Sequence, residues 1–455
     1  MNYTFGHIIK KFRESKGLSI SEVENAVNIT HLRRLENGRI EHPKLQTLEK
    51  VVNFLGIPWE EIAEPYALKQ ANRETIISIV KKVLPVITQD SLYNITHHFI
   101  VISSSIQSGI DDLAMYADSL EKGKEASKLY SVLSKHALNY HKNDLLANFL
   151  LSEYLIRRDG DFTGSYYLGK RVIDHAHLLI TEKKVLAYYK VGVHASLLKD
   201  YTYSNDCLKK IVEDDSLISS FKEKAYHAYY NNLINVERIE EGEKYLEEYA
   251  LKFNKYKSSN YIIDKASIHS KRGNIGEAIL MLEEYLRKFK EDHDTIVAVN
   301  LLLELYMKSN KFDQARELYR YEELFKRMTH ENDLRGPFNK NTYGLYLRLK
   351  GRLEYLVGNF KGAVESILLS METFSTMGFK DEFIEGLDVL YTFNRTQLIG
   401  KFSSGKPLID VNVQLGISEC LKKLIKTREK EITHEKVFNG VYDDGFVCCT
   451  PIYSI

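Results

Sequence analysis

Small residues recur at a nearly constant interval along the second half of this 455-residue chain, and this spacing constrains the fold more than any other feature. The residues are Ser204, Gly242, Ala278, Ala315 and Ala363. The first three intervals are 38, 36 and 37 residues, and the last is 48 residues. A repeat of this length holds one pair of helices, which must stack on neighbouring pairs to bury its apolar face. The longer interval predicts an insertion, which we place at residues 325–342.

The clearest units resemble tetratricopeptide repeats, because a turn sequence precedes each small residue and small residues allow close helix contact. Their motifs are Gly351 with Gly358-Asn359-Phe360 and Ala363, Ala266 with Gly273-Asn274-Ile275 and Ala278, and Asn310-Lys311-Phe312 with Ala315. Weaker copies lie at 237–242, 199–204 and 159–165. With only seven prolines in the chain, long helices are favoured throughout. We therefore predict an all-α fold that contains a right-handed TPR-like α-solenoid.

Residues 1–64 have a different pattern, which predicts five short helices. Apolar side chains at Phe5, Ile9 and Phe12 share one helical face, and Gly17 ends that helix. A capping box over 19–22 starts a second helix, and a third fits 30–37, with Leu32 and Leu35 buried. The fourth follows Pro43 and the fifth starts at Pro58. Such a layout is typical of a helix-turn-helix domain.

Three motifs make this part of the chain resemble phage repressors of the Cro and XRE type. They are Gly17-Leu18-Ser19, Leu35-Glu36-Asn37-Gly38, and Leu48-Glu49-Lys50-Val51 with Leu55-Gly56-Ile57. The resemblance implies that the third helix reads the major groove of double-stranded DNA, although the interval from Gly17 to Gly38 is shorter than is usual in that family. Carried over by position, the reading residues are Thr30, His31, Arg33 and Arg34, and the phosphate contacts are Lys10, Lys11, Arg39 and Lys44. The alternative is a module that has lost DNA binding and docks only protein.

Charge supports a local rather than a global DNA surface. The whole chain has a formal net charge of +1, whereas residues 1–50 hold nine Lys and Arg against six Glu. The sequence contains no glycine-rich phosphate loop, H-E-x-x-H or C-x-x-C motif, so we expect no enzyme activity, cofactor or metal. Its four cysteines, the lack of a signal sequence and the lack of a long apolar run predict a cytoplasmic protein that does not enter membranes.

The four predicted parts are a helix-turn-helix domain (1–64), a linker helix with atypical helical repeats (65–150), the TPR-like repeats (151–400), and a C-terminal helix and tail (401–455). This architecture resembles the peptide-pheromone receptors of Gram-positive bacteria and their phages, namely the Rap/NprR/PlcR/PrgX group and the arbitrium (AimR) receptors. The resemblance implies a homodimeric transcriptional regulator that binds a DNA operator. It also implies that a short signalling peptide in the groove of the repeats changes DNA affinity, as in quorum sensing or phage lysis–lysogeny decisions.

Repeat register gives the residues expected to face that groove. They are His227, Asn231, Asn235, Asn260, Ser267, Asn300, Glu304, Arg348 and Arg352. Asparagine can pair with both backbone groups of an extended peptide, and arginine can hold a carboxylate through two hydrogen bonds. The alternative is a Rap-like interaction module that binds a response regulator or another protein partner.

Overall fold

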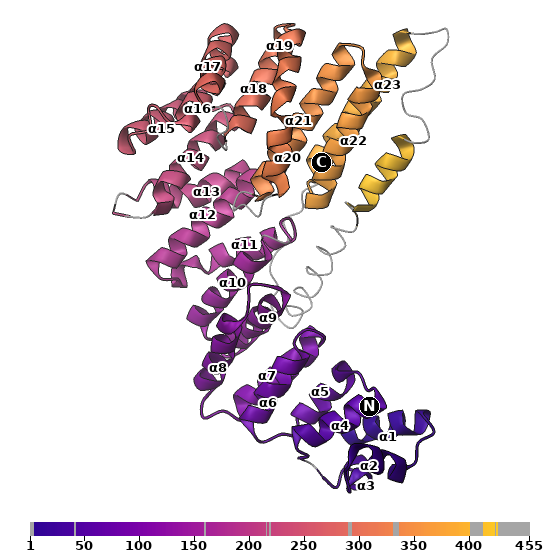
Figure 1. The fold of residues 1–455 in the computed structure, drawn as a ribbon. Coiled ribbons are helices and arrows are strands. Elements are labelled where there is room, and N and C mark those ends of the chain that lie inside the picture. The colour runs from indigo at the N-terminus through magenta and orange to yellow at the C-terminus, as the bar shows by residue number, and fades with distance from the viewer. Residues whose placement is uncertain are drawn as a thin grey trace, which may run out of the picture. The chain divides into compact units, whose positions relative to one another are not determined.

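The computed structural model describes residues 4–425 apart from 41, 159–160, 215, 218–219, 290–293, 331–335, 401–412 and 424. All regular elements in these residues are helices, with no strand among them, which confirms the predicted all-α class. The chain divides into two compact units, one of Met1–Arg157 with Asp174–Leu179 and the other of Arg158–Ile173 with Ile180–Ile455. Figure 1 shows the helices in chain order.

None of the helices in the described residues is both long and apolar enough to cross a membrane.

The first unit begins with the five predicted short helices, which we call the head. They are α1 (Phe5–Ser15), α2 (Ile20–Val27), α3 (Leu32–Glu36), α4 (Leu45–Leu55) and α5 (Trp59–Ala67). Leu32 and Leu35 are buried, as predicted. The capping box is also confirmed, because Ser19 accepts from the Glu22 N–H while the Glu22 side chain accepts from the Ser19 N–H.

The third helix is shorter than the sequence suggests, and the fifth is longer. Asn28 ends α2 in the left-handed conformation, and α3 begins only at Leu32. In contrast, α5 continues through Pro65 to Ala67, past residue 64 where we placed the end of the head. Burial of Tyr66 and Ala67, both with no exposed surface, offsets the hydrogen bond that a proline removes from a helix.

The head packs directly on the helices that follow it. The rest of the first unit comprises α6 (Arg73–Val83), α7 (Gln89–Val101), α8 (Ile106–Ser119), α9 (Lys124–Asn139), α10 (Asn143–Arg157) and the short helix η1 (Ala176–Leu178). Lys82 of α6 pairs with Glu49 at 2.7 Å and lies 4.6 Å from the centre of the Trp59 ring. Asn94 of α7 donates to Glu64 at 2.7 Å. The head and these helices therefore form one body within the first unit.

The second unit contains the repeats. Its helices are α11 (Ser165–Asp174), α12 (Thr181–Leu197), α13 (Tyr201–Val212), α14 (Ser220–Asn235), α15 (Ile239–Lys252), α16 (Ser259–Lys271), α17 (Ile275–Lys288), α18 (Thr295–Lys308), α19 (Phe312–Glu317), η2 (Leu318–Tyr321), α20 (Glu322–His330), α21 (Gly336–Leu356), α22 (Phe360–Met377) and α23 (Lys380–Gly400). Consecutive helices pack as antiparallel pairs along this series (Figure 1). The head is thus followed by TPR-like repeats, as predicted.

The turn within each helix pair has the same backbone geometry. One residue adopts a positive φ at each turn, and these residues are Lys199, Glu237, Gly273, Asn310 and Gly358. The next residue donates its N–H to a carbonyl five positions back, at 2.8–2.9 Å in all five turns. A common turn at the repeat interval supports the repeat assignment independently of the small residues.

The small residues lie where two helices of a pair meet. Ser204, Ala278, Ala315 and Ala363 have no exposed surface. A Cβ on Gly242 would lie 2.7 Å from a side-chain carbon of Ile234, closer than real Cβ atoms approach. The periodic small residues therefore set the distance between the paired helices.

The predicted insertion at 325–342 overlaps a helix, α20, which begins three residues earlier, at Glu322. Phe325 of α20 has no exposed surface and packs edge to face on Tyr346 of α21. Lys350 of α21 also pairs with Glu322 at 2.5 Å. Helix α20 thus packs on the second half of α21. Of the predicted C-terminal helix, residues 413–423 are helical, and the tail from 426 lies outside the described residues.

Candidate nucleic-acid interface

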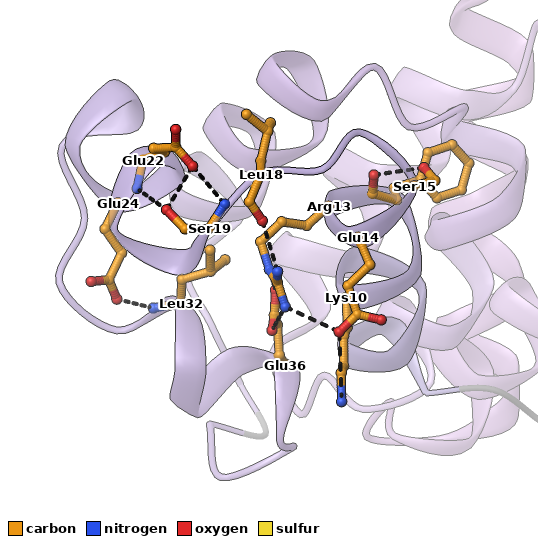
Figure 2. A network of polar contacts seen from close by, with 11 residues as sticks. Lys10, Arg13, Glu14, Ser15, Leu18, Ser19, Glu22, Glu24, Leu32 and Glu36 are labelled. Carbon is orange, nitrogen blue, oxygen red and sulfur yellow. Dashed lines mark hydrogen bonds and ion pairs between the residues drawn. The ribbon is translucent and has the colours of Figure 1, made fainter.

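A buried ion pair joins the first and third helices of the head. The Arg13 guanidinium donates to both carboxylate oxygens of Glu36, from Nε at 2.6 Å and from Nη2 at 2.9 Å, and from Nη1 to the Leu18 carbonyl at 2.9 Å (Figure 2). The two side chains are 10% and 3% exposed. The hydrogen bonds to Glu36 raise the pKa of Arg13 further above its usual range. This pair fixes α3 against α1.

The turn between α2 and α3 is held by a residue of α2. The His31 side chain makes no cap at the start of α3, but the Leu32 N–H donates to Glu24 Oε1 at 2.8 Å (Figure 2). A first-turn amide of a helix needs such an acceptor, which the preceding residue commonly supplies. In this head the acceptor comes from the neighbouring helix, and it ties α3 to α2 across the shortened turn.

All eight residues predicted to contact DNA are exposed. Lys10 and Lys11 lie on α1, Arg33 and Arg34 on α3, Arg39 after α3, and Lys44 immediately before α4. Thr30 and His31 precede α3 instead of lying within it, since α2 ends late and α3 starts at Leu32. Their side chains lie 3.3 Å apart, from Thr30 Oγ1 to His31 Nε2.

The pairing of Arg13 with Glu36 was not predicted from the sequence, in which Arg13 counts toward the positive charge of residues 1–50. Its position contained a signal, because Phe5, Ile9 and Arg13 follow one another at four-residue intervals on the buried face of α1. A long polar side chain on such a face needs a buried partner. The pair removes one charge of each sign from the surface, so the positive excess of residues 1–50 is unchanged.

Among the residues predicted to face the groove, the structure brings together His227 and Asn231 on α14. Asn231 Nδ2 donates to the His227 carbonyl at 3.0 Å, and His227 Nε2 lies 3.4 Å from Asp264 Oδ2 of α16. Asp264 is buried and accepts a hydrogen bond from Tyr230 at 2.7 Å. Asp264 and Tyr230 were not predicted as site residues, because they belong to no recognisable sequence motif.

The other predicted groove residues are more dispersed. Asn260 and Ser267 are half-buried, whereas Asn235 and Arg352 are exposed. Asn300 donates to the Thr342 carbonyl at 3.0 Å. Glu304 pairs with Lys308 on its own helix at 2.8 Å.

Arg348 is buried and already paired. Its Nη2 lies 2.8 Å from Glu385 Oε2, and its Nη1 donates to the Glu382 carbonyl at 3.3 Å. Burial lowers the pKa of Arg348 from its usual value, and Glu385 opposes this effect. The guanidinium of Arg348 is therefore engaged with α23.

Within the described residues, no group of three or more His, Cys, Asp and Glu side chains is arranged to hold a metal ion.

Residues 9–62 match a helix-turn-helix family model, which covers α2, α3 and α4, most of α1 and the first four residues of α5. The protein thus carries an XRE-type helix-turn-helix DNA-binding domain in front of a TPR-like array. A search of curated proteins finds no match to the sequence.

Several solved structures share the helical architecture at low identity. A tetratricopeptide repeat protein from Parabacteroides merdae is 13% identical, with 61% of this chain and 97% of that one covered and a TM-score of 0.45. A Rap protein in complex with competence and sporulation factor is 14% identical, covering 83% and 99%, with a TM-score of 0.40. PlcR of Bacillus thuringiensis, in complex with a peptide and DNA, is 16% identical, covering 71% and 98%, with a TM-score of 0.22.

Proposed function

We propose that the protein is a cytoplasmic, homodimeric transcriptional regulator whose TPR-like repeats bind a short signalling peptide that changes its affinity for DNA. This is regulation of the quorum-sensing or phage lysis–lysogeny type. Each DNA half-site would receive one α3, and a twofold dimer would set the spacing between half-sites. The peptide acts by binding one arrangement of the dimer more tightly than the other.

The exposed residues around α3 carry the proposal. Arg33 and Arg34 lie on a helix that the Arg13–Glu36 pair and Glu24 hold in place. A fixed short helix with exposed guanidinium groups suits guanine edges in the major groove. Exposed lysines on α1 and before α4 suit the phosphates on either side, where they position the head without reading bases.

The test is binding of the full chain to a duplex from the region upstream of its own gene, measured by fluorescence anisotropy over a series of salt concentrations. We expect Arg33→Ala or Arg34→Ala to weaken specific binding by about 1–3 kcal/mol, roughly five- to 150-fold. Lys44→Ala should weaken binding to all duplexes and reduce the salt slope by about one. The matched control is Lys361→Ala, which removes a lysine that is 88% exposed in the second unit.

A chain that binds its upstream duplex no better than a random one at every salt concentration, with and without candidate peptides, would contradict the proposal.

The peptide part of the proposal rests on the polar cluster of His227, Asn231 and Asp264, which joins two adjacent repeats. Candidate peptides are the C-terminal segments of short secreted products encoded beside the gene. Isothermal titration of the full chain should show binding that His227→Ala or Asn231→Ala weakens and that Lys361→Ala leaves unchanged. If a response regulator binds the chain with or without the head and no peptide does, the Rap-like interaction module is the better description.

A further inference from the structure

The segment just before α11, near the beginning of the second unit, contacts the turn between α22 and α23. Thr163, just before α11, donates from Oγ1 to the Met377 carbonyl at the end of α22, at 2.8 Å across 214 residues of sequence. The Phe162 ring meets the Phe379 ring edge to face, with centroids 5.8 Å apart. In a helical repeat array each repeat contacts its neighbours, so stacking alone does not account for contacts over this separation.

A set of charged residues lies beside these contacts. Lys199, which follows α12, pairs with Glu382 at 2.7 Å and with Glu385 at 3.2 Å, both on α23. Arg348 of α21 pairs with Glu385 and donates to the Glu382 backbone. Glu382 and Arg348 are 7% and 8% exposed. Two cations thus face two carboxylates. The buried charges of Arg348 and Glu382 depend on the other members for compensation, whereas Lys199 and Glu385 are 41% and 47% exposed.

The aromatic contact is anchored on α12 as well. His194 of α12 donates from Nε2 to the Phe162 carbonyl at 2.6 Å, and its ring lies 4.1 Å from the Phe162 ring. Burial lowers the pKa of His194 to about 3, so the imidazole is neutral and Nε2 carries its hydrogen. Phe162 is therefore held on α12 while its ring reaches the start of α23.

Lys199 occupies a backbone position that does not favour lysine. Its φ is +61°, in the left-handed region where glycine and asparagine are preferred. At the equivalent turns of later repeats, glycine or asparagine stands at 273, 310 and 358, and Glu237 is a second charged residue with this backbone. From this turn the Lys199 side chain bridges to Glu382 and Glu385 of α23.

We propose that these contacts form a clasp that closes the second unit on itself and fixes the pitch of its repeats. The clasp consists of Phe162, Thr163, Lys199, Arg348, Phe379, Glu382 and Glu385. A ligand that changes the curvature of the repeats must open or tighten the clasp. The helices at its two sides, α11–α12 and α21–α23, would then move together when the ligand binds. This inference does not depend on the identity of any ligand or on DNA binding.

The test is hydrogen–deuterium exchange of the full chain, followed at the amides of residues 379–386. Lys199→Asn removes the charge but keeps a residue that suits the left-handed turn, so the fold of α12 and α13 is preserved. We expect about tenfold faster exchange in residues 379–386, more than 180 residues away in sequence. The matched control is Lys209→Asn, which removes a lysine paired only locally, at 3.4 Å with Glu213 on the same helix, and should leave that exchange unchanged.

A pair of charge-reversal variants distinguishes loss of the clasp from a general loss of stability. Lys199→Glu should speed exchange at residues 379–386, and Lys199→Glu with Glu382→Lys should restore much of the protection. The clasp is overturned if Lys199→Asn leaves exchange at the start of α23 unchanged. It is also overturned if the double variant is less protected than either single variant.

Discussion

The Arg13–Glu36 pair allows a quantitative prediction for the head. Glu36→Ala leaves the Arg13 guanidinium, whose side chain is 10% exposed, with the Leu18 carbonyl at 2.9 Å and the exposed Glu14 carboxylate at 3.5 Å, and removes both contacts to Glu36. Removing one partner of a buried ion pair costs about 3–5 kcal/mol, because the remaining charge stays out of water without compensation. We expect a value in this range, since both carboxylate oxygens are used and both side chains are buried.

Hydrogen–deuterium exchange at the amides of α1 and α3 in the full chain measures this loss directly, since it reports the local free energy of opening. At 1.36 kcal/mol per tenfold change, Glu36→Ala should lower protection by roughly two to three and a half orders of magnitude. The chain offers a control on the same arginine. Glu14 lies 3.5 Å from Arg13 with a side chain 56% exposed, so Glu14→Ala should cost less than about 1 kcal/mol.

Equal losses of protection in Glu36→Ala and Glu14→Ala would contradict the conclusion that the buried pair with Glu36 stabilises the head more than the exposed contact with Glu14. The same conclusion also fails if replacing both Arg13 and Glu36 by apolar residues of similar size costs as much as Glu36→Ala alone. The double replacement removes the uncompensated charge, and such replacements are often neutral or stabilising.

Three further predictions concern other parts of the chain. Gly6→Ala should abolish DNA binding in the anisotropy assay, because the added Cβ would clash with the Leu35 carbonyl oxygen of α3. Gly276→Ala, whose Cβ would meet no atom within 4 Å, should leave DNA binding unchanged and raise the free energy of unfolding by about 0.5–1 kcal/mol. Loss of DNA binding in both variants, or in neither, would contradict the packing argument. Burial raises the pKa of Glu322, but the pair with Lys350 outweighs this and holds it below 4.5, so its stabilisation is present above that value and lost as pH falls. The protection factors of the α20 amides, which are corrected for the intrinsic slowing of exchange in acid, should therefore fall as the pH is lowered, and this fall should be smaller in Glu322→Gln. Lys82→Ala removes both the pair with Glu49 and the contact with Trp59, so it should lower the free energy of opening of α5 and α6 by about 1–2 kcal/mol and speed their amide exchange accordingly. Unchanged exchange would show that the head is held by other contacts.

The turns show what the sequence could predict about the repeats. Gly273, Asn310 and Gly358 were visible as turn residues, because glycine and asparagine accept a positive φ. Lys199 and Glu237 adopt the same backbone, but a charged side chain carries no signal for it. The weaker repeats were therefore placed only by the spacing of small residues.

The sites were predictable to different degrees. Exposure of the residues around α3 followed from helical periodicity, since polar residues lie opposite the buried leucines of a short helix. The partner of Arg13 is 23 residues away and the partners of Lys199 more than 180, and no local pattern links residues at such separations. Arg348 was predicted from its register in the repeat, but its pairing with Glu385 depends on where α23 packs.

The contacts between the head and α6 and α7 also bear on how such a protein can evolve. A DNA-binding domain on a free linker can be exchanged for another by recombination, because nothing beyond the junction depends on its surface. Here Glu49, Trp59 and Glu64 of the head are bonded to side chains of the next two helices. A transplanted head would need matching residues at all three positions. If the head binds DNA as proposed, new DNA specificities are therefore expected to arise by substitution within the head and not by exchange of the domain.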